Sequence, residues 1–194
     1  DQQINISLIF SNLYIVLMFL LPIITVKAFS EERRNNTFEL LYTSPVNKYE
    51  IYFGKFLSSF VFFLAMSVPT ISYLIFYFSW SEALVGAVIA SYMEYFFIGG
   101  TYIALALLFS LVIKNQYVAI VAAILINLFL TLLVGYALTF IKNGILYQIL
   151  SFLSFYNHMG VTFRGIMDLN NILYYLIFQA FLMYISINFI EVSK

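Results

Sequence analysis

The chain of 194 residues is 63% hydrophobic, 20% aromatic and only 9% charged, with a mean hydropathy of +0.97 and a net charge of zero. This composition excludes a water-soluble domain, because such a domain would expose a large adhesive apolar surface. The sequence has no cysteine and one histidine, which excludes disulfides, thiolate chemistry and a histidine-cluster metal site. We therefore predict an integral membrane protein.

Five apolar stretches are each near the ~20 residues that a helix needs to cross ~30 Å of hydrocarbon. They run from about Ile4 to Val26, Phe56 to Ser81, Tyr95 to Ile113, Gln116 to Ile141 and Leu169 to Ile190. The spans that they predict run from about Leu8 to Phe29, Glu50 to Phe78, Ala83 to Ile113, Val118 to Ile141 and Leu169 to Ile190. The strict alternation of apolar and polar residues that is typical of an outer-membrane barrel strand is absent. We predict an all-α polytopic transmembrane bundle with five spans, which forms one domain over residues 1–194.

The first two spans each contain a proline. Pro22 and Pro69 each remove one helix hydrogen bond. We therefore expect a kink near the cytoplasmic end of the first span and another in the outer half of the second. Neighbouring helices can accommodate both, so packing is the expected role.

A charged segment between the first two spans, residues 27–55, holds half of the charged residues of the chain. Within it, Asn36 followed by Glu39 has the spacing of a capping box, which predicts the start of a short helix. Pro45 disfavours the α conformation at Ser44 and therefore ends that helix.

The short helix has one apolar face, because Phe38, Leu41 and Tyr42 are spaced i, i+3, i+4. This spacing fits an amphipathic turn on the lipid surface and a protein-docking helix equally well. The capping pattern is repeated by Asn47 and Glu50, which predicts the start of the second span.

The distribution of positive charge predicts the orientation of the chain. If the charged segment is cytoplasmic, the cationic residues inside are Lys27, Arg33, Arg34, Lys48, Lys55, Lys114 and Lys194, and those outside are Lys142 and Arg164. This arrangement satisfies the positive-inside rule, and the opposite orientation violates it. It also places Asp1 outside without a leader sequence, so we expect an upstream span and about six spans in the full protein.

The third span contains the carboxylate Glu94, for which two positions are open. A span that starts near Tyr95 leaves Glu94 hydrated at the outer interface. A span that starts near Ala83 buries it, neutral or bonded to a tyrosine hydroxyl, where it lines a cavity. The neighbouring glycines suit close helix packing. The candidates for the pathway or for packing are Glu94, Gly99, Gly100 and Asn127.

The segment before the last span, residues 142–170, is apolar but is broken by Gly144 and Gly160 among others. It predicts one or two short helices that dip into the outer leaflet, where protein must cover their ends. His158 is a lone histidine and is expected to have no functional role. Asp168 is expected to cap the last span.

Three blocks of sequence carry a family resemblance. They are ITVKAFSEERRNNTFELLYTSPV at 24–46, followed by Ile51, Gly54 and Lys55; LFSLVIKNQYVA at 108–119; and SFYNHMGVTFRGIMDLNNILYY at 154–175. In this order they resemble ABC-2 type transporter permeases, especially the gliding-motility-associated branch. The chain departs from that branch at Lys27, where arginine is frequent, and at Asn170 and Asn171, where a charged pair is frequent.

The resemblance implies a permease subunit that pairs with a second permease, in a homo- or heterodimer, and with two cytoplasmic ATPase subunits. The family's amino-terminal amphipathic helix and first span have no counterpart in this chain, and its extracellular re-entrant helices would be the short helices before the last span. The loop after the family's second span would be the coupling helix. Its docking residues would be Glu31, Glu32, Arg33, Arg34, Thr37, Phe38, Glu39, Leu41, Tyr42, Thr43, Ser44 and Pro45.

The sequence has no Gly-rich phosphate loop and no Ser/His/Asp constellation, so we predict a non-enzymatic subunit without a cofactor of its own. ATP and Mg²⁺ are expected in the partner ATPase, and no nucleic acid is expected as a partner. We predict a multi-pass permease of the bacterial cytoplasmic membrane that works as an exporter. The alternatives are an ion- or proton-coupled transporter or channel that uses Glu94, and a non-transporting membrane anchor that recruits a cytoplasmic partner.

Overall fold

The computed structural model describes residues 6–35, 46–72, 85–141, 144–162 and 169–192, and every regular element in these ranges is a helix. The elements are α1 (Ile6–Thr25), α2 (Lys27–Arg34), α4 (Lys48–Ser67), the 3₁₀ helix η1 (Val68–Thr70), α6 (Val85–Val112), α7 (Gln116–Leu128), the π-helix η2 (Phe129–Leu133), α8 (Val134–Phe140), α9 (Ile145–Leu153), α10 (Phe155–Thr162) and α11 (Leu169–Val192).

The predicted all-α bundle with five spans is confirmed. Within the described ranges, five helical stretches are long and apolar enough to cross a membrane: Ile9–Arg34, Lys48–Thr70, Val88–Val112, Gln116–Phe140 and Leu169–Ile190. The second span was predicted to reach Phe78, but residues 73–84 lie outside the described part of the chain. The chain is thus a multi-pass helical membrane protein.

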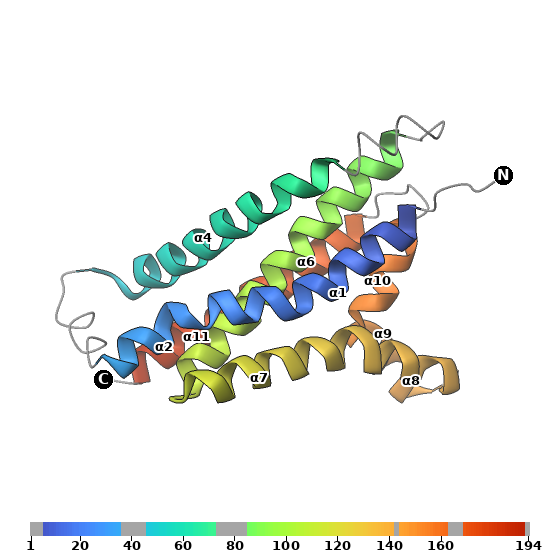
Figure 1. Cartoon of the computed structure of the whole chain (residues 1–194). Coiled ribbons are helices and arrows are strands. Elements are labelled where there is room, and N and C mark those ends of the chain that lie inside the picture. The colour runs from blue at the N-terminus through green and yellow to red at the C-terminus, as the bar shows by residue number, and fades with distance from the viewer. Residues whose placement is uncertain (1–5, 36–45, 73–84, 142–143, 163–168, 193–194) are drawn as a thin grey trace.

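Helix α6 is the centre of the bundle, and it contacts α1, α2, α4, α7, α10 and α11. It is also the most buried span, with 72% of its most apolar window inside the protein against at most 44% for the others. A helix that is apolar on all sides can be covered by neighbours on all sides. Figure 1 shows α6 crossing behind α1, while α11 runs along its far side.

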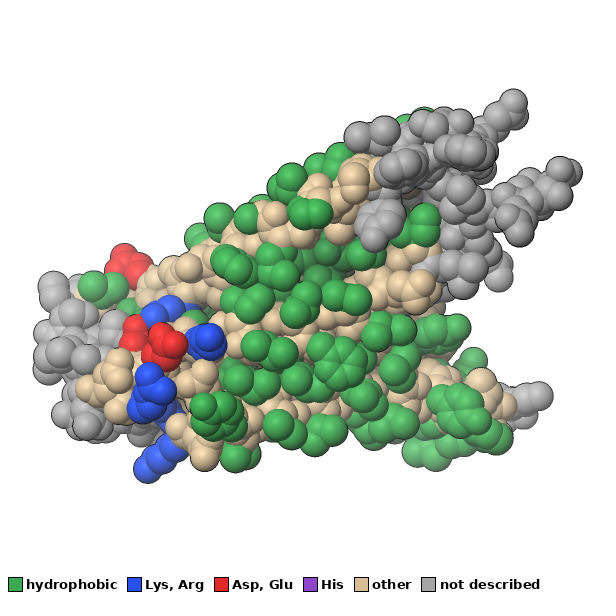
Figure 2. All heavy atoms as spheres, viewed as in Figure 1, with side chains coloured by type: hydrophobic (Ala, Val, Ile, Leu, Met, Phe, Trp, Pro, Cys, Tyr) green, Lys and Arg blue, Asp and Glu red, His purple; other side chains and the backbone are tan. Residues whose placement is uncertain are grey.

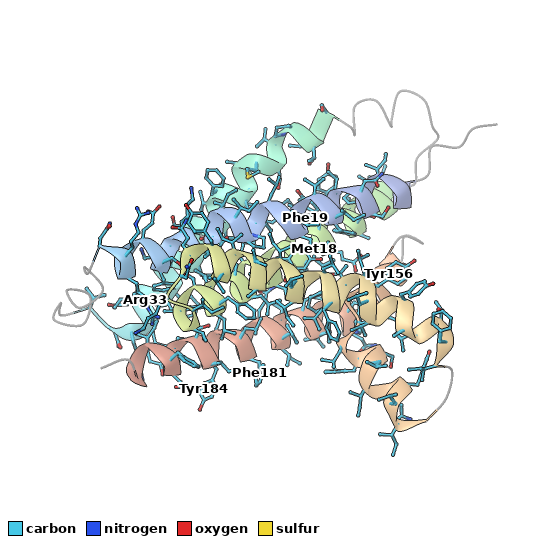
Figure 3. All side chains as sticks on the ribbon, turned by 60° about the horizontal axis from the view of Figure 1, so that its bottom comes forward. Met18, Phe19, Arg33, Tyr156, Phe181 and Tyr184 are labelled. Atoms are coloured by element: carbon cyan, nitrogen blue, oxygen red, sulfur yellow. The ribbon has the colours of Figure 1, made fainter. Side chains whose placement is uncertain are left out.

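The outer helices have one buried and one exposed side. On α1, Met18 is only 1% exposed, whereas the adjacent Phe19 is 41% exposed. On α11, Phe181 and Tyr184 point away from the bundle (Figure 3) and are more than half exposed. Large exposed apolar side chains of this kind are expected where a protein surface faces lipid rather than water.

Both prolines coincide with departures from regular α-helix, as expected. Helix α1 ends at Thr25, three residues after Pro22, and α2 begins after a turn at Val26. Pro69 lies inside the 3₁₀ helix η1, which follows directly on α4. The first span was predicted to run from about Leu8 to Phe29. It reaches Arg34, but the turn at Val26 divides it.

The fourth span is not the single regular helix predicted from its apolar sequence. A π-helical turn, η2, separates α7 from α8. Tertiary contacts are made at this turn, where Thr131 of η2 bonds Tyr102 of α6. Just beyond it, a Cβ added at Gly135 would lie 2.9 Å from the Cβ of Tyr156, so α8 and α10 approach closely.

The segment between the last two spans forms two short helices, as predicted. Helix α9 starts after Gly144, whose φ of 100° is in the region that favours glycine. Helix α10 packs on α6, α8 and η2. The predicted cap Asp168 lies outside the described residues. Figure 1 shows α10 at the same end of the bundle as the start of α1.

Candidate functional site

The charged side chains gather at one end of the bundle, which we call the charged end (Figure 2). It is formed by α2, the start of α4 and the turn between α6 and α7. Among the charged side chains that the structure describes, it holds Lys27, Glu31, Glu32, Arg33, Arg34, Lys48, Glu50, Lys55 and Lys114. Only Glu94, in the described set, lies elsewhere. This clustering agrees with the predicted cytoplasmic side.

Helix α2 is anchored on one side and open on the other. Phe29 and Ser30 are buried, whereas Glu31 and Arg34 are exposed and Arg33 is partly exposed. Figure 3 shows Arg33 at the charged end. Arg33 and Arg34 lie in the last turn, where positive charge interacts favourably with the helix dipole.

An ion pair joins α2 to α4. The ammonium group of Lys55 donates to the carboxylate of Glu32, and both side chains are about one-quarter exposed. The same ammonium lies 5.7 Å from the centre of the Phe29 ring, within the range of a cation–π contact. The start of α4 is therefore tied to α2, although ten residues between them are not described.

Eight of the twelve predicted docking residues lie outside the described residues, as does the predicted cap Asn36; the eight are Thr37, Phe38, Glu39, Leu41, Tyr42, Thr43, Ser44 and Pro45. Glu31, Glu32, Arg33 and Arg34 are brought together on α2. The predicted capping pair after this segment is confirmed, because the Asn47 N–H donates to Oε2 of Glu50 at 3.0 Å. The structure thus places the residues on both sides of the predicted docking segment at the charged end.

The turn between α6 and α7 also lies at the charged end. The Asn115 side chain accepts from the N–H groups of Tyr117 at 3.0 Å and Val118 at 3.5 Å, and so caps α7. This cap gives Asn115 a structural role at the start of α7.

Glu94 is buried, with 5% of its surface exposed, in the third turn of α6. The hydrated position at the outer end of the span, one of the two left open by the sequence, is therefore wrong. Helix α6 covers Val85–Val112 and its membrane-spanning stretch Val88–Val112, so the carboxylate lies within the span and not before it. Glu94 lies within electrostatic reach of the hydroxyls of Tyr14 on α1 and Tyr175 on α11.

The glycine pair of α6 serves packing. A Cβ added at Gly99 would overlap the Phe63 ring of α4, and one at Gly100 would lie 2.9 Å from Nε2 of Gln179 on α11. The absence of a side chain at Gly100 leaves room for the Gln179 amide. Its Nε2 donates to the Phe97 carbonyl at 2.7 Å and to Thr101 Oγ1 at 3.1 Å. Gln179 was not predicted as a candidate, although it is a lone polar residue in the middle of an apolar span.

Asn127, the fourth candidate, is fully buried near the end of α7. Its amide nitrogen and oxygen have no hydrogen-bond partner within the structure as described. The residue lies just before the π-helix η2, and a π-helical turn is frequent at functional positions. A role in the pathway or in packing remains a prediction for Asn127.

His158 has a structural role that the sequence did not reveal. Its Nδ1 lies 2.9 Å from Oδ1 of Asn171, and Nδ2 of Asn171 donates to the His158 carbonyl at 3.0 Å. The imidazole also stacks on Tyr174, with ring centres 3.9 Å apart. These contacts fasten α10 to the start of α11.

An apolar cavity of about 380 Å³ opens between α4, α6 and α11. Its walls are Phe56, Phe60, Leu64, Met93, Phe96, Phe97 and Gln179. Six of these seven side chains are apolar, so the cavity suits hydrocarbon groups. No cluster of histidine, cysteine or acidic residues within the described ranges could hold a metal ion.

The fold and the charged end define a multi-pass helical membrane protein. The family model described as "ABC-2 family transporter protein" matches residues 1–191, nearly the whole chain. The chain belongs to this family, and it is a membrane permease of an ABC transporter. A comparison with curated proteins found no match. The family match does not distinguish the gliding-motility-associated branch, which stays a prediction.

Proposed function

We propose that the chain forms the substrate pathway of an ABC exporter in the bacterial cytoplasmic membrane and that residues 31–45 dock on a separate ATPase. The observation that carries this proposal is the placement of α2. Its buried side is fixed to the bundle, and its exposed end, with Glu31 and Arg34, leads into the predicted docking segment at the charged end.

In this proposal the ATPase subunits bind ATP and Mg²⁺, and a second permease, identical or related, completes the pathway. ATP binding favours one of two permease states, open to the inside or to the outside, through the docking segment. The family match supports this assembly, because ABC-2 permeases work with ABC ATPases. We assign the chain to the gliding-motility-associated branch on its three sequence blocks.

The docking surface has two kinds of residue with different expected roles. The charges of α2 form a rim that steers the partner and orients it. Phe38 and Leu41 are proposed as the apolar anchors, and desolvated aromatic anchors usually carry more of the binding energy than rim charges. Removing an anchor is therefore expected to weaken binding more than removing a rim charge.

The test is a double variant, Phe38→Ala with Leu41→Ala. Each substitution is expected to weaken ATPase association by on the order of 1–3 kcal/mol, measured by pull-down and by ATPase activity in nanodiscs. Arg34→Ala is expected to cost less and to become more sensitive to salt, because its charge is exposed to solvent ions.

The matched control is Phe181→Ala with Tyr184→Ala, an apolar pair with the same i, i+3 spacing on the exposed side of α11. This control is expected to keep full ATPase association. Full association of the Phe38→Ala/Leu41→Ala variant would refute the docking model and would leave the segment as a turn on the lipid surface.

A further inference from the structure

The Ser110 hydroxyl of α6 forms hydrogen bonds with the backbone of the first span at the junction between α1 and α2. Ser110 Oγ donates to the Val26 carbonyl at 2.6 Å and accepts from the Ser30 N–H at 3.1 Å. Its contact with Ser30 Oγ is also 3.1 Å. Because a hydroxyl has a single hydrogen, which Ser110 gives to Val26, Ser30 is the donor in this third bond. We call these three bonds the Ser110 latch.

The latch lies at a weak point of the first span. Within the helix, the Ser30 N–H donates to the Val26 carbonyl over 3.3 Å. The same N–H also donates to the Ser110 hydroxyl, and the same carbonyl also accepts from it. One turn earlier, Pro22 lacks the N–H that a regular helix would use. A helix bends most readily where a proline or an inserted side chain interrupts its ladder. The helical ladder of the first span is therefore weakened at this junction, where Ser110 connects it to α6.

All three residues of the latch are excluded from solvent, with exposures of at most 1%. Val26 also packs against the small residues Ala106, Ala119 and Ala123, which allow α6 and α7 to approach its backbone. Without the Ser110 hydroxyl, the Ser30 N–H and the Val26 carbonyl would keep only their 3.3 Å bond to each other, and the hydrogen bonds to α6 would be lost.

We propose that Ser110 is a positioning residue that fixes α2 to the central helix α6, so that movement of the docking segment is passed on to α6. The transmission of movement from the docking segment to α6 rests on the proposed function, whereas the attachment of α2 to α6 does not. The Lys55–Glu32 ion pair joins α2 to α4 instead, and it is partly exposed and screened by salt. The latch therefore adds buried, directional hydrogen bonds between α2 and α6 to the apolar packing of Phe29.

The structural part is tested without the ATPase. The chain has no cysteine, so spin labels can be placed at Arg34→Cys on α2 and Tyr117→Cys on α7, both exposed positions. Ser110→Ala removes all three bonds and is expected to widen the distribution of distances between these labels. Ser30→Ala removes one bond and is expected to widen it less. An unchanged distribution in Ser110→Ala would overturn the latch.

The matched control is Ser186→Ala, which also removes a fully buried serine hydroxyl. The Ser186 hydroxyl donates to the Leu182 carbonyl inside α11 at 2.8 Å. The control is expected to leave the Arg34–Tyr117 label distances unchanged. An equal widening in Ser186→Ala would show general loosening of the bundle and would also overturn the latch.

The functional part uses the complex with its ATPase in nanodiscs, with labels at the opposite end of the bundle, Val85→Cys on α6 and Leu169→Cys on α11. MgATP with orthovanadate is expected to shift this distance in the parent protein. In Ser110→Ala the ATPase is expected to stay bound, while the shifted fraction falls about fivefold or more. A full shift in Ser110→Ala would overturn the transmission role. If the parent permease binds no ATPase, the proposed function fails, but the Arg34–Tyr117 measurement still decides the latch.

Discussion

The Phe63 ring of α4 lies directly against the backbone of Gly99 on α6, in the space that any side chain at residue 99 would occupy. Phe63 is fully buried. Its ring is held by Tyr95 and Phe96, whose ring centres lie 5.2 and 5.9 Å away. The ring therefore has little room to move aside, and the contact fixes the distance between α4 and α6.

We expect Gly99→Ala to destabilise the bundle by about 1–3 kcal/mol, because the added methyl group overpacks this contact. The measurement is the midpoint of thermal unfolding in detergent. The control is Gly86→Ala on the same helix, where nothing lies within 4 Å of the new Cβ. This control is expected to be neutral or slightly stabilising, since alanine favours helix over glycine. Equal midpoints for the two variants would contradict the packing role of Gly99.

Hydropathy and length were sufficient to predict the five spans, because a helix that crosses lipid needs an uninterrupted apolar stretch of defined length. Local signals also worked where the partner is close in sequence, as with Asn47 and Glu50. Two short helices before the last span followed from the glycines that interrupt an apolar segment.

The sequence could not predict the contacts that join distant helices. A uniformly apolar span such as the fourth gives no periodic signal for a π-helical turn, so η2 was missed. Ser110 and Gln179 are polar residues in apolar spans, but their partners depend on which helices pack together. The depth of Glu94 likewise depended on where its helix begins. Each of these features is decided by tertiary packing.

The orientation of the bundle in the membrane can be tested by labelling single cysteines, because the chain has no cysteine of its own. Cysteines at Ile145 and Leu169, which are 77% and 73% exposed, are expected to react with a membrane-impermeant maleimide in intact cells. Cysteines at Arg34 and Tyr117 are expected to react only after the cells are permeabilised. The reverse pattern would invert the topology and move the docking segment outside.

Glu94→Gln is expected to leave expression and folding intact, because glutamine keeps the shape of the buried side chain and removes its charge. A carboxylate charge at the centre of a membrane helix costs roughly 2.5–3.5 kcal/mol, so such residues are usually functional. We therefore expect the variant to change the ATPase activity of the complex in nanodiscs. Unchanged activity would assign Glu94 to packing. Transport driven by a pH gradient alone, lost in Glu94→Gln, would instead favour a proton-coupled transporter.

The hydrogen bond between Tyr102 of α6 and Thr131 of η2 is 2.8 Å long and nearly excluded from solvent, since the two residues are 0% and 5% exposed. Tyr102→Phe or Thr131→Val removes one hydroxyl and leaves the other buried without a partner. Such a loss costs about 1–3 kcal/mol, whereas removing both partners together can be nearly neutral. We therefore expect the double variant to be at least as stable as the less stable of the two single variants.

This expectation is checked by a double-mutant cycle, with thermal unfolding of all four proteins in the same detergent. Thr131→Val is the informative single change, because valine has nearly the same shape as threonine and keeps the packing of η2. If the bond holds the π-helical turn against α6, the two single losses will not add. Additive losses would mean that the hydroxyls act independently and that η2 is held to α6 by apolar packing alone.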